Sequence, residues 1–348
     1  MAETLRRIVL ASRPQGHPVA DNFRLEEAPL PTPGAGEMLV RVLWLSLDPY
    51  MRGRMDDAKS YSAPVPVSGT MEGGTVGQVI ASNNPKFAAG DFVLTHSGWC
   101  SHAVSDGKGV RKLDPALAPL QANLGVLGMP GLTAYAGLAE HGRPKAGETL
   151  VVGAATGAVG SMVGQLAKIQ GLRAVGVAGG AEKCAFAVEE LGFDACIDHR
   201  AAADARALRA QIAAACPDGI DIYWENVGAE TLEAVVPLMN MFGRIPVCGM
   251  IAWYDLGGLG LGAPPPGPNL LPQVWRNILV KRLAVRGFIV TDHADRFRDF
   301  MAEVPGYIRD GRVRYRESVT EGLENSPAAF MAMLKGGNFG KTLVRVAD

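Results

Sequence analysis

The sequence has few cysteines, and none of them is placed for a disulfide framework or for a C-x-x-C metal site. The five are scattered, with none within eleven residues of another: Cys100, Cys184, Cys196, Cys216 and Cys248. Such spacing suits a reducing compartment such as the cytoplasm. The simplest role for all five is that of small core residues.

Long apolar runs and an excess of one charge are also missing. Residues 1–10 hold only the short apolar segment Ile8-Val9-Leu10, which is too short for the core of a signal peptide, and no run is long enough to span a bilayer. The chain has 34 basic and 35 acidic residues, so nothing in its charge favours nucleic acid or an anionic membrane as a partner. We therefore expect a cytoplasmic protein without a nucleic-acid or membrane partner.

The strongest pattern that is present runs over residues 149–171. An apolar run at 150–154 is typical of a buried parallel strand, a turn of small residues follows, and a helical pattern with one apolar face comes next. Strand, small-residue turn and helix predict the first half of a dinucleotide-binding unit, with the pyrophosphate at the helix N-terminus. The cofactor contacts expected in the turn are Ala155, Thr156, Gly157, Ala158, Val159 and Gly160.

Ala155 stands where the pattern G-x-G-x-x-G has its first glycine, so the turn alone would also fit an ordinary α/β protein. The downstream sequence favours the nucleotide-binding interpretation. Segments 173–179, 195–199 and 220–226 are predicted strands, and helical segments separate them. This βαβ alternation predicts an α/β fold with a doubly wound parallel sheet of the Rossmann type.

The regions on either side of this unit are rich in predicted strands, including 38–45, 73–81 and 92–95. A helix is expected to begin at Met129. A last sheet-like strand is expected at 287–290, with a helix from about His293 to Arg309 after it. Because residues 313–346 return to β character, we expect them to rejoin the first region. The predicted domains are therefore 1–127 with 309–348, and 128–308.

One segment has an unusual composition. Residues 255–269 are dominated by glycine and proline and can form neither a helix nor an ordinary strand. Two interpretations stay open. The segment is either a solvated surface loop or a mobile flap over a pocket.

Seven motifs together resemble the medium-chain dehydrogenase/reductase superfamily, and in particular its zinc-free alkenal and prostaglandin reductase branch, which includes bacterial curcumin reductases. They lie at residues 48–55, 128–135, 154–164, 223–228, 242–245, 248–251 and 334–342. The resemblance implies a β-rich, chaperonin-like (GroES-like) partial barrel beside a Rossmann domain, with the active site in the cleft between them. It also implies NADPH-dependent reduction of the C=C bond of α,β-unsaturated aldehydes and ketones, and a homodimer.

The zinc ligands of related alcohol dehydrogenases are missing. Where those enzymes carry a Gly-His-Glu signature, this chain has Met71 before Glu72. His96, Cys100 and His102 are close in sequence, but two histidines and one cysteine on a turn do not make a zinc site. We expect no metal, so hydrogen-bond donors must polarise the substrate carbonyl.

The end of the second predicted strand indicates which dinucleotide binds. An NAD-selective unit usually has an acidic residue there, whereas this chain has Gly179. In related NADPH reductases the position of Lys183 binds the 2′-phosphate, and a tyrosine after the third strand is replaced here by His199 followed by Arg200. Lys183 could instead be a solvated helix residue, and Glu182 beside it is an objection to phosphate binding. NADPH is the better fit.

The resemblance also implies contacts to the rest of the cofactor. An amide side chain can donate and accept, which suits ribose hydroxyls and a carboxamide, although a buried asparagine can equally satisfy a turn. The implied residues are Pro130, Thr133, Asn226, Cys248, Gly249, Met250, Ile251, Phe288, Ile289, Val290 and Asn338.

Reduction of an enone needs hydride at the β-carbon and a donor for the negative charge that grows on the carbonyl oxygen. Tyr50 and Tyr254 match tyrosines that line the substrate cleft of curcumin-reductase-like members, and each could also be a structural tyrosine. Val280 stands where plant and mammalian relatives have another tyrosine, which puts their substrate preference in doubt. A quinone reductase and a non-catalytic NADPH-binding protein are the alternative functions.

Overall fold

The computed structural model describes residues 4–258, 260, 262–264, 267 and 269–347. The chain forms two compact units. The first consists of Met1–Gly125, Tyr254–Pro264 and Glu317–Asp348, and the second of Val126–Trp253 and Pro265–Arg316. The first boundary falls after Gly125, where 127 was predicted, and the second before Glu317, where 309 was predicted; the segment 254–264 lies with the first unit.

The second unit is built on a six-stranded parallel sheet with the strand order β10-β9-β8-β11-β12-β13. Its central strand, β8, is buried along its whole length, as the apolar run predicts. In chain order the strands are β8 (Thr149–Gly153), β9 (Arg173–Ala178), β10 (Ala195–Asp198), β11 (Ile220–Trp224), β12 (Met239–Val247) and β13 (Ala284–Gly287). The predicted doubly wound sheet is thereby confirmed.

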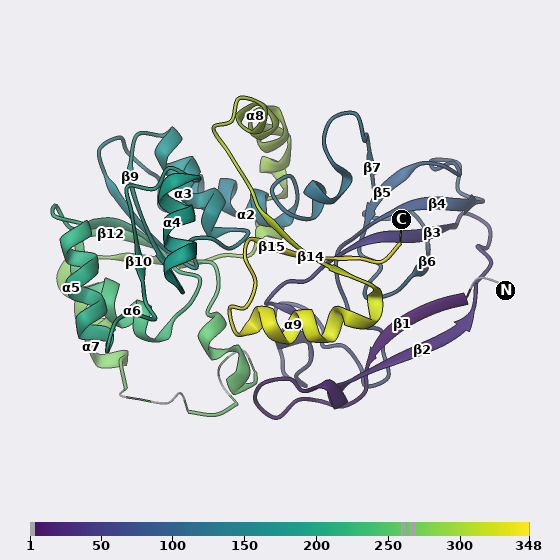
Figure 1. Ribbon diagram of the computed structural model, residues 1–348, viewed down its shortest axis with the longest axis horizontal. Coiled ribbons are helices and arrows are strands. Elements are labelled where there is room, and N and C mark those ends of the chain that lie inside the picture. The colour runs from purple at the N-terminus through teal and green to yellow at the C-terminus, as the bar shows by residue number, and fades with distance from the viewer. Residues whose placement is uncertain (1–3, 259, 261, 265–266, 268, 348) are drawn as a thin grey trace. The chain divides into compact units, whose positions relative to one another are not determined.

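Helices connect these strands. α3 packs on β8 and β9, α4 packs on β9 and β10, and α5 packs against α6 (Figure 1). The helices are α2 (Met129–Gly137), α3 (Gly160–Ile169), α4 (Ala181–Glu189), α5 (Ala205–Ala215), α6 (Ala229–Val235), α7 (Leu271–Lys281) and α8 (Phe297–Arg309). Shorter helical segments are η3 (Leu138–Gly142), η4 (Val236–Leu238), η5 (Ile251–Leu256) and η6 (Val290–Arg296).

The predicted end of this sheet was wrong in detail. β13 stops at Gly287, so Phe288 and Ile289 lie beyond the strand, and Val290 begins a 3-10 segment. The backbone of His293 is not helical (φ −121°), so the helical conformation is interrupted before α8. The helix therefore begins at Phe297 and not at His293.

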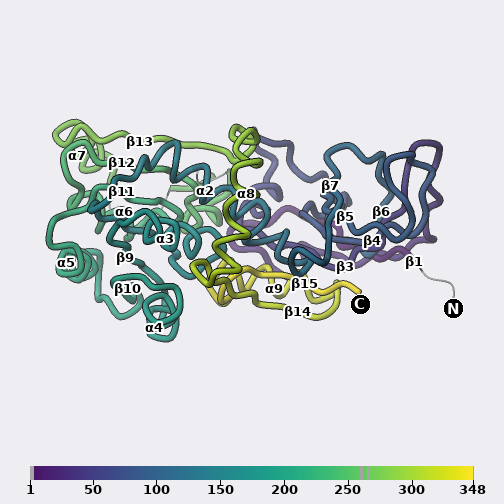
Figure 2. Tube along the Cα trace, turned by 90° about the horizontal axis from the view of Figure 1, so that it is seen from above, coloured from purple at the N-terminus to yellow at the C-terminus, as the bar shows by residue number. Residues whose placement is uncertain are grey.

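The first unit contains a sheet with the order β14-β15-β3-β4-β5-β7, in which β6 also pairs with β3, and a separate antiparallel pair of β1 and β2. Figure 2 shows the C-terminal strands β14 and β15, in yellow, next to the purple β3. The strands are β1 (Thr4–Leu10), β2 (Phe23–Pro29), β3 (Met38–Ser46), β4 (Thr75–Ser82), β5 (Phe92–Thr95), β6 (His102–Ser105), β7 (Arg111–Leu113), β14 (Glu317–Glu321) and β15 (Lys341–Arg345). Its helical segments are η1 (Ala20–Asn22), α1 (Met51–Arg54), η2 (Leu120–Leu124), η7 (Leu323–Asn325) and α9 (Ser326–Leu334).

The prediction that the C-terminal tail is all β was wrong at α9. This helix brings Phe330 into the core of the first unit, where its ring meets Trp99 edge to face at 5.5 Å. Trp99 in turn stacks on Phe23 of β2 at 5.7 Å. The buried aromatic cluster therefore joins the tail to the N-terminal part of the same unit.

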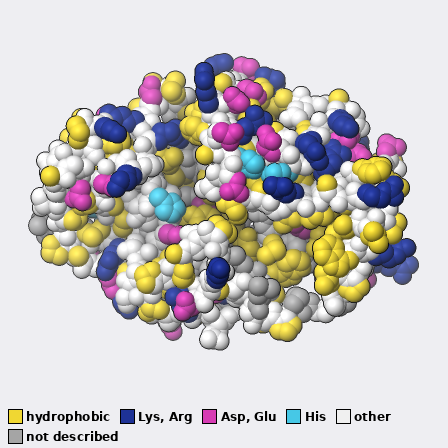
Figure 3. Space-filling model, turned by 180° about the vertical axis from the view of Figure 1, so that it is seen from behind, with side chains coloured by type: hydrophobic (Ala, Val, Ile, Leu, Met, Phe, Trp, Pro, Cys, Tyr) yellow, Lys and Arg dark blue, Asp and Glu magenta, His cyan; other side chains and the backbone are white. Residues whose placement is uncertain are grey.

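The described surface has a mixed charge. On the face shown in Figure 3, basic and acidic side chains are interspersed, in keeping with a formal net charge of −1. Among the described residues, no helix combines the length and the apolar character that a membrane crossing requires.

Candidate functional site

The turn between β8 and α3 has the tight backbone that a phosphate-binding turn requires. A Cβ added at Gly160 would lie 2.3 Å from the carbonyl oxygen of Ala154, so only glycine fits there. Gly157 is less constrained, because its Cβ would lie 3.2 Å from the same oxygen, to which the Gly157 N–H donates at 2.9 Å. Ala154 itself has a positive φ of 52°. Of the two glycines, Gly160 is therefore the one that no residue with a Cβ can replace without a shift of the backbone.

The departure at Ala155 is compensated by another glycine. Ala155 is completely buried, and its N–H donates to the Val177 carbonyl of β9 at 3.1 Å. A Cβ added at Gly176 of β9 would lie 2.7 Å from the Ala155 methyl group. Because Gly176 has no side chain, the neighbouring strand leaves room for the Ala155 methyl group of the turn.

The N-terminus of α3 faces this turn without a side-chain cap of its own. Its N-cap residue is Val159, which has no acceptor to offer to the first N–H groups of the helix. Ser161 N already donates to the Gly157 carbonyl at 3.0 Å, so it is the positive end of the helix dipole that makes this position suitable for an anion. Thr156 and Ala158 belong to the same turn.

Two nitrogen-bearing side chains, those of His199 and Arg200, lie next to the glycine that follows β9. A Cβ at Gly179 would lie 2.8 Å from Arg200 Nε and 2.9 Å from His199 Nε2, so the missing side chain makes room for both. Asp198 fixes this corner, because its Oδ1 accepts from the N–H of Gly180 at 2.7 Å and of Arg200 at 3.0 Å. We call Lys183, His199 and Arg200 the basic cluster.

The pKa values of the basic cluster show that its members affect one another. Burial lowers the pKa of Lys183, and the nearby Arg200 lowers it further, while Glu182 acts in the opposite direction. Burial and Arg200 likewise lower the pKa of His199. Crowded positive charge of this kind is relieved by a bound phosphate and would not be relieved by a neutral ribose hydroxyl.

The end of β11 holds a buried acid that the sequence analysis noted only as part of a motif. Glu225 Oε1 accepts from the N–H groups of Val227 at 2.5 Å and Gly228 at 2.8 Å, and Oε2 accepts from the Tyr223 hydroxyl at 2.9 Å. Burial raises the pKa of Glu225 to about 7 in spite of these hydrogen bonds. The sequence signal for this residue was an acidic side chain directly after an apolar strand. The hydrogen bonds of Glu225 stiffen the turn after β11.

Asn226 bridges two strand ends. Its Nδ2 donates to the Gly153 carbonyl of β8 at 2.9 Å, and its Oδ1 accepts from Trp224 Nε1 at 3.0 Å. The amide therefore satisfies the turn, and one N–H and one lone pair remain for a ligand. The segment from Cys248 to Ile251 lies against this corner, since Cys248 N donates to Glu225 O at 2.9 Å and Ile251 N to Asn226 O at 3.2 Å. Gly249 and Met250 lie between them.

Phe288 is buried between Trp224 and helix α2, which carries two further predicted cofactor contacts. Its ring meets Trp224 edge to face at 5.7 Å, and a Cβ at Gly137 of α2 would lie only 2.4 Å from it. In α2 the hydroxyl of Thr133 donates to the Met129 carbonyl at 2.7 Å, and Pro130 lies in the first turn. Ile289 and Val290 continue from Phe288. Asn338 lies in the first unit, where its Nδ2 donates to the Gly340 carbonyl at 2.8 Å.

Tyr50 lies two residues after Asp48, which forms a buried ion pair in the first unit. Asp48 Oδ1 accepts from Lys341 Nζ at 2.7 Å, and Oδ2 accepts from the Ser46 hydroxyl. Burial raises the pKa of Tyr50 above its usual range, and the carboxylates of Asp48 and Glu72 add to the effect. The phenol is therefore protonated at neutral pH and can act as a donor. Tyr254 lies in η5 and is half-buried.

The two arginines next to Tyr50 were missed as functional candidates. Arg54 donates from Nε to Glu72 Oε1 at 2.9 Å, and its guanidinium lies over the Tyr61 ring at 4.2 Å and the Tyr50 ring at 5.8 Å. Arg52 is fully buried. Two arginines in an otherwise apolar short helix were a signal, because a buried guanidinium needs fixed partners.

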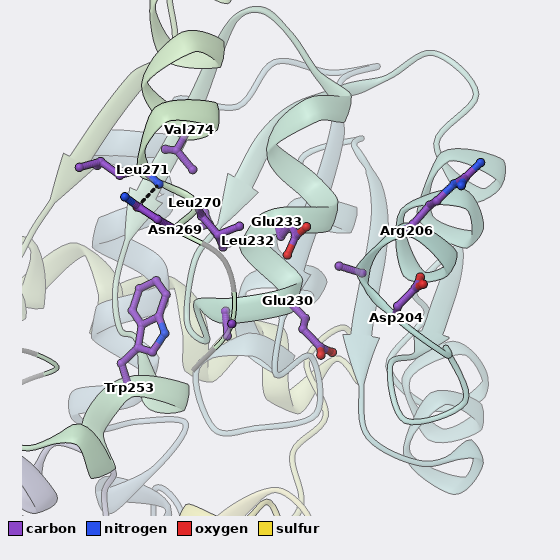
Figure 4. Close-up of a pocket in the computed structure, with 13 residues that line it drawn as sticks. Asp204, Arg206, Glu230, Leu232, Glu233, Trp253, Asn269, Leu270, Leu271 and Val274 are labelled. Atoms are coloured by element: carbon purple, nitrogen blue, oxygen red, sulfur yellow. Dashed lines mark hydrogen bonds between the residues drawn. The ribbon is translucent and has the colours of Figure 1, made fainter. Parts of the chain in front are cut away.

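A cavity of about 600 Å³ opens between α5, α6 and α7 (Figure 4). Trp253 forms one wall and packs on Gly228, where a Cβ would lie 3.0 Å from the indole ring. Carboxylates gather on α6 and at the start of α5, so the cavity repels phosphate and is not the phosphate site. The lining residues are Asp204, Ala205, Arg206, Ala229, Glu230, Leu232, Glu233, Trp253, Gly267, Asn269, Leu270, Leu271 and Val274.

Two residues of the glycine- and proline-rich segment, Gly267 and Asn269, line this cavity. The segment's other end is a 3-10 turn, because η5 includes Asp255 and Leu256. The rest of the interpretation as a loop or a flap falls in part outside the described residues, at 259, 261, 265–266 and 268.

In the part of the chain that the structure describes, no three His, Cys, Asp or Glu side chains gather as they would around a metal ion. Of the three residues considered from the sequence, Cys100 donates to the Ser97 carbonyl at 3.3 Å. His102 is buried, with Nδ1 at 3.0 Å from the Ser101 hydroxyl. His96 is exposed.

Known proteins are similar to this chain over nearly its whole length. Residues 6–113 match the family model described as the N-terminal domain of oxidoreductase, and residues 158–304 match that of zinc-binding dehydrogenase. The NADPH-dependent curcumin reductase of Escherichia coli (strain K12) is 52% identical over 98% of this chain and 97% of its own length. Prostaglandin reductase 1 of Rattus norvegicus is 42% identical over 95% of this chain and 96% of its own length.

A solved structure agrees. The crystal structure of CurA from Vibrio vulnificus in complex with NADPH has a TM-score of 0.92 and 50% sequence identity, and the match covers 99% of both chains. The chain thus belongs to the medium-chain dehydrogenase/reductase superfamily, in the branch that holds the curcumin and prostaglandin reductases.

Proposed function

We propose that this protein is an NADPH-dependent reductase of the C=C bond of α,β-unsaturated aldehydes and ketones, and that it works without a metal. The observation that carries the proposal is the 52% identity, over nearly the whole chain, to an NADPH-dependent curcumin reductase. The basic cluster at Gly179 supports the choice of NADPH, since three nitrogen-bearing side chains replace the acid of an NAD site. When bound, this cofactor supplies the hydride that reaches the β-carbon.

The residues present fit the cofactor. Gly160 and the uncapped N-terminus of α3 suit the pyrophosphate, and the basic cluster suits the 2′-phosphate. Asn226 keeps one donor and one acceptor for the ribose or the carboxamide. The remaining contacts implied by the resemblance, Phe288 and Asn338 among them, are part of the same proposal.

The tyrosines supply the donor that the chemistry needs. As the β-carbon is reduced, negative charge grows on the carbonyl oxygen, and a neutral phenol aimed at that oxygen stabilises it. A phenol with an ordinary pKa is already protonated at neutral pH, and burial raises the pKa of Tyr50 further, so the donor is present. We assign the donor role to Tyr50 and Tyr254. The proton that the α-carbon takes up comes from solvent or a weak acid.

Replacement of either phenol tests this assignment. We expect Tyr50→Phe and Tyr254→Phe each to lower kcat by about 10²- to 10³-fold, because loss of one oxyanion donor typically has that effect. NADPH affinity, measured by fluorescence titration, should change little. Tyr307→Phe, which removes an exposed hydroxyl bonded to Glu303, is the matched control. A variant with unchanged turnover would remove that tyrosine from the mechanism.

A substrate panel separates the alternative functions. The purified protein is mixed with NADPH and with enals, cyclic enones, bis-enones and quinones, and NADPH consumption and product mass are followed. Saturation of the C=C bond supports the proposal. Turnover of quinones alone would support a quinone reductase, and tight NADPH binding without any turnover would support a non-catalytic protein. The panel also shows whether the valine at 280 excludes the substrates of plant and mammalian relatives.

We further propose that the protein is a cytoplasmic homodimer. The strand β13 is the last of its sheet and all its residues are exposed, so its open edge is available for pairing. Exposed apolar side chains of the adjacent α7, Trp275 and Leu279 among them, would be covered by a second copy.

A charged side chain introduced on α7 tests the proposed dimer interface. Leu279→Asp, at a side chain that is 77% exposed, should convert a dimer into a monomer in light-scattering measurements. The control is Leu117→Asp, because Leu117 is equally exposed (80%) but lies in the first unit. A wild-type protein that is already monomeric would contradict the proposal.

A further inference from the structure

Arg52 joins three segments of the first unit that are far apart in sequence. Its side chain is completely buried, and Nη1 donates to Asp56 Oδ1 at 2.6 Å. Nη2 and Nε donate to the Gly16 carbonyl at 2.8 and 3.3 Å, and Nε lies 3.5 Å from Asp255 Oδ1. The guanidinium therefore has a fixed set of partners on every side that is described.

The same partners hold the segment that carries Tyr254. Asp255 follows Tyr254 directly, and its Oδ2 lies 2.8 Å from His17 Nδ1. Asp56 Oδ2 accepts from the N–H of Gly258 at 2.8 Å. Both sides of a short stretch of η5 and the turn after it are thus fastened to the unit by charged groups.

This arrangement exceeds what stability alone requires. The Arg52–Asp56 pair, one helical turn apart, already neutralises the buried guanidinium. The additional contacts are the Arg52–Asp255 ion pair at 3.5 Å and the hydrogen bonds of His17 with Asp255 and of Gly258 with Asp56, and all of them involve the segment 254–258. The hydrogen bond within that segment, from Gly257 N to Tyr254 O at 3.3 Å, is local and does not fix the place of the segment on the unit.

We propose that Arg52, Asp56, Asp255 and His17 form a positioning network that holds Tyr254 in place relative to α1, the helix whose N-cap is Tyr50. Arg52 lies two residues after Tyr50, and its guanidinium lies 3.5 Å from the side chain of Asp255, the residue after Tyr254. None of the four residues is among those assigned above to the substrate or the cofactor, so we give them a positioning role that acts through Tyr254. This inference rests on the proposed function, because it assigns to Tyr254 the donor role given above.

Asp255→Asn is the first test, because the amide keeps the size of the side chain and loses its charge. We expect kcat to fall about 10- to 100-fold, as a donor displaced by an ångström would cause, with the KM for NADPH unchanged. Asp255→Glu, which keeps the charge, should restore part of the rate. Asp91→Asn is the control. Asp91 lies in the same unit, pairs with Lys112 at 2.7 Å and accepts from Ala88 N at 2.9 Å.

A double-mutant cycle separates positioning from general stability. If Asp255 acts through Tyr254, Asp255→Asn should lower kcat less than threefold in the Tyr254→Phe background, but by its full factor in the Tyr50→Phe background. An equal fall in both backgrounds would overturn the network's role, and so would wild-type kcat in Asp255→Asn alone.

Hydrogen exchange gives a readout that does not depend on turnover. Asp56→Asn and Asp255→Asn should speed exchange of the amides at 255–258, and Asp91→Asn should not. Unchanged exchange would overturn the inference. If Tyr254→Phe turns over like the wild type, the donor role of Tyr254 fails. If Tyr254→Phe is slow while Asp255→Asn is normal, the network alone fails.

Discussion

At the scale of single residues, the basic cluster is the feature with the sharpest consequence. Arg200 lies beside Gly179, and its charge lowers the pKa of Lys183. A phosphate group with two negative charges would attract both cations, whereas a hydroxyl would not. We therefore expect these side chains to select between NADPH and NADH.

Lys183→Ala tests that selection. We expect NADPH to bind about 10- to 100-fold more weakly, since one charge-assisted contact is lost, and NADH to bind as before. Both dissociation constants are measured by fluorescence titration. Lys168→Ala is the control, because Lys168 lies on α3 and pairs with Asp194 at 2.8 Å. Equal weakening of both dinucleotides would show that Lys183 acts on something other than the 2′-phosphate.

At the scale of elements, α3 depends on a glycine that faces another side chain. A Cβ at Gly164 would lie 1.9 Å from the buried ring of Phe193, so helix and ring touch through the missing side chain. The close approach brings α3 onto the sheet that carries the phosphate turn.

Gly164→Ala should therefore lower the free energy of unfolding by about 1–3 kcal/mol, the usual cost of overpacking a core. Gly306→Ala provides a matched control in α8, where the nearest atom is Arg309 Nη2 at 3.7 Å. There the better helix propensity of alanine should leave stability unchanged or raise it by up to about 1 kcal/mol. Urea unfolding measures both. The same loss in both variants would point to backbone effects and not to Phe193.

The strand, turn and helix at 149–171 could be predicted from the sequence because their pattern is local. The apolar run, the small residues and the 3.6-residue periodicity all lie within one short stretch. The compensation of Ala155 by Gly176 could not be predicted, because the two residues meet only through strand pairing. The same reason applies to Arg52, whose partners at 16 and 255 are distant in sequence.

Errors in the predicted elements have a similar cause. The helix α9 lies between two strands, and the β character of its surroundings hid the pattern of Phe330 and Met333, which face the core. The end of β13 was placed too late because Phe288 to Val290 are apolar enough for a strand. Phe288 is buried instead by packing against Trp224 and α2.

At the scale of the whole molecule, the main sheet of the first unit is completed by a C-terminal strand. Lys341 and Asp48 form an ion pair in which both side chains are less than a tenth exposed, across 293 positions of sequence. The strand that carries Lys341, β15, lies inside its sheet, between β14 and β3. The N-terminal part of the unit is therefore incomplete without the tail.

Lys341→Met should lower stability by about 3–5 kcal/mol, because it leaves the Asp48 carboxylate buried and unpaired. Lys108→Met is the contrast, since Lys108 makes an ion pair of the same 2.7 Å length but is 89% exposed. Surface pairs of that kind contribute about 0–1 kcal/mol. Urea unfolding followed by tryptophan fluorescence measures both, and a small effect of Lys341→Met would mean that Asp48 finds another donor.

The late position of Lys341 has a consequence for how the protein is made. During synthesis, residues 126–316 are complete and able to fold while the strand that finishes the first unit has not yet been translated. Until β15 has been synthesised, the edge of β3 is open and Asp48 lacks its cation. Removal of β15 would therefore take a strand out of the middle of a sheet and leave the Asp48 carboxylate buried without its ammonium partner.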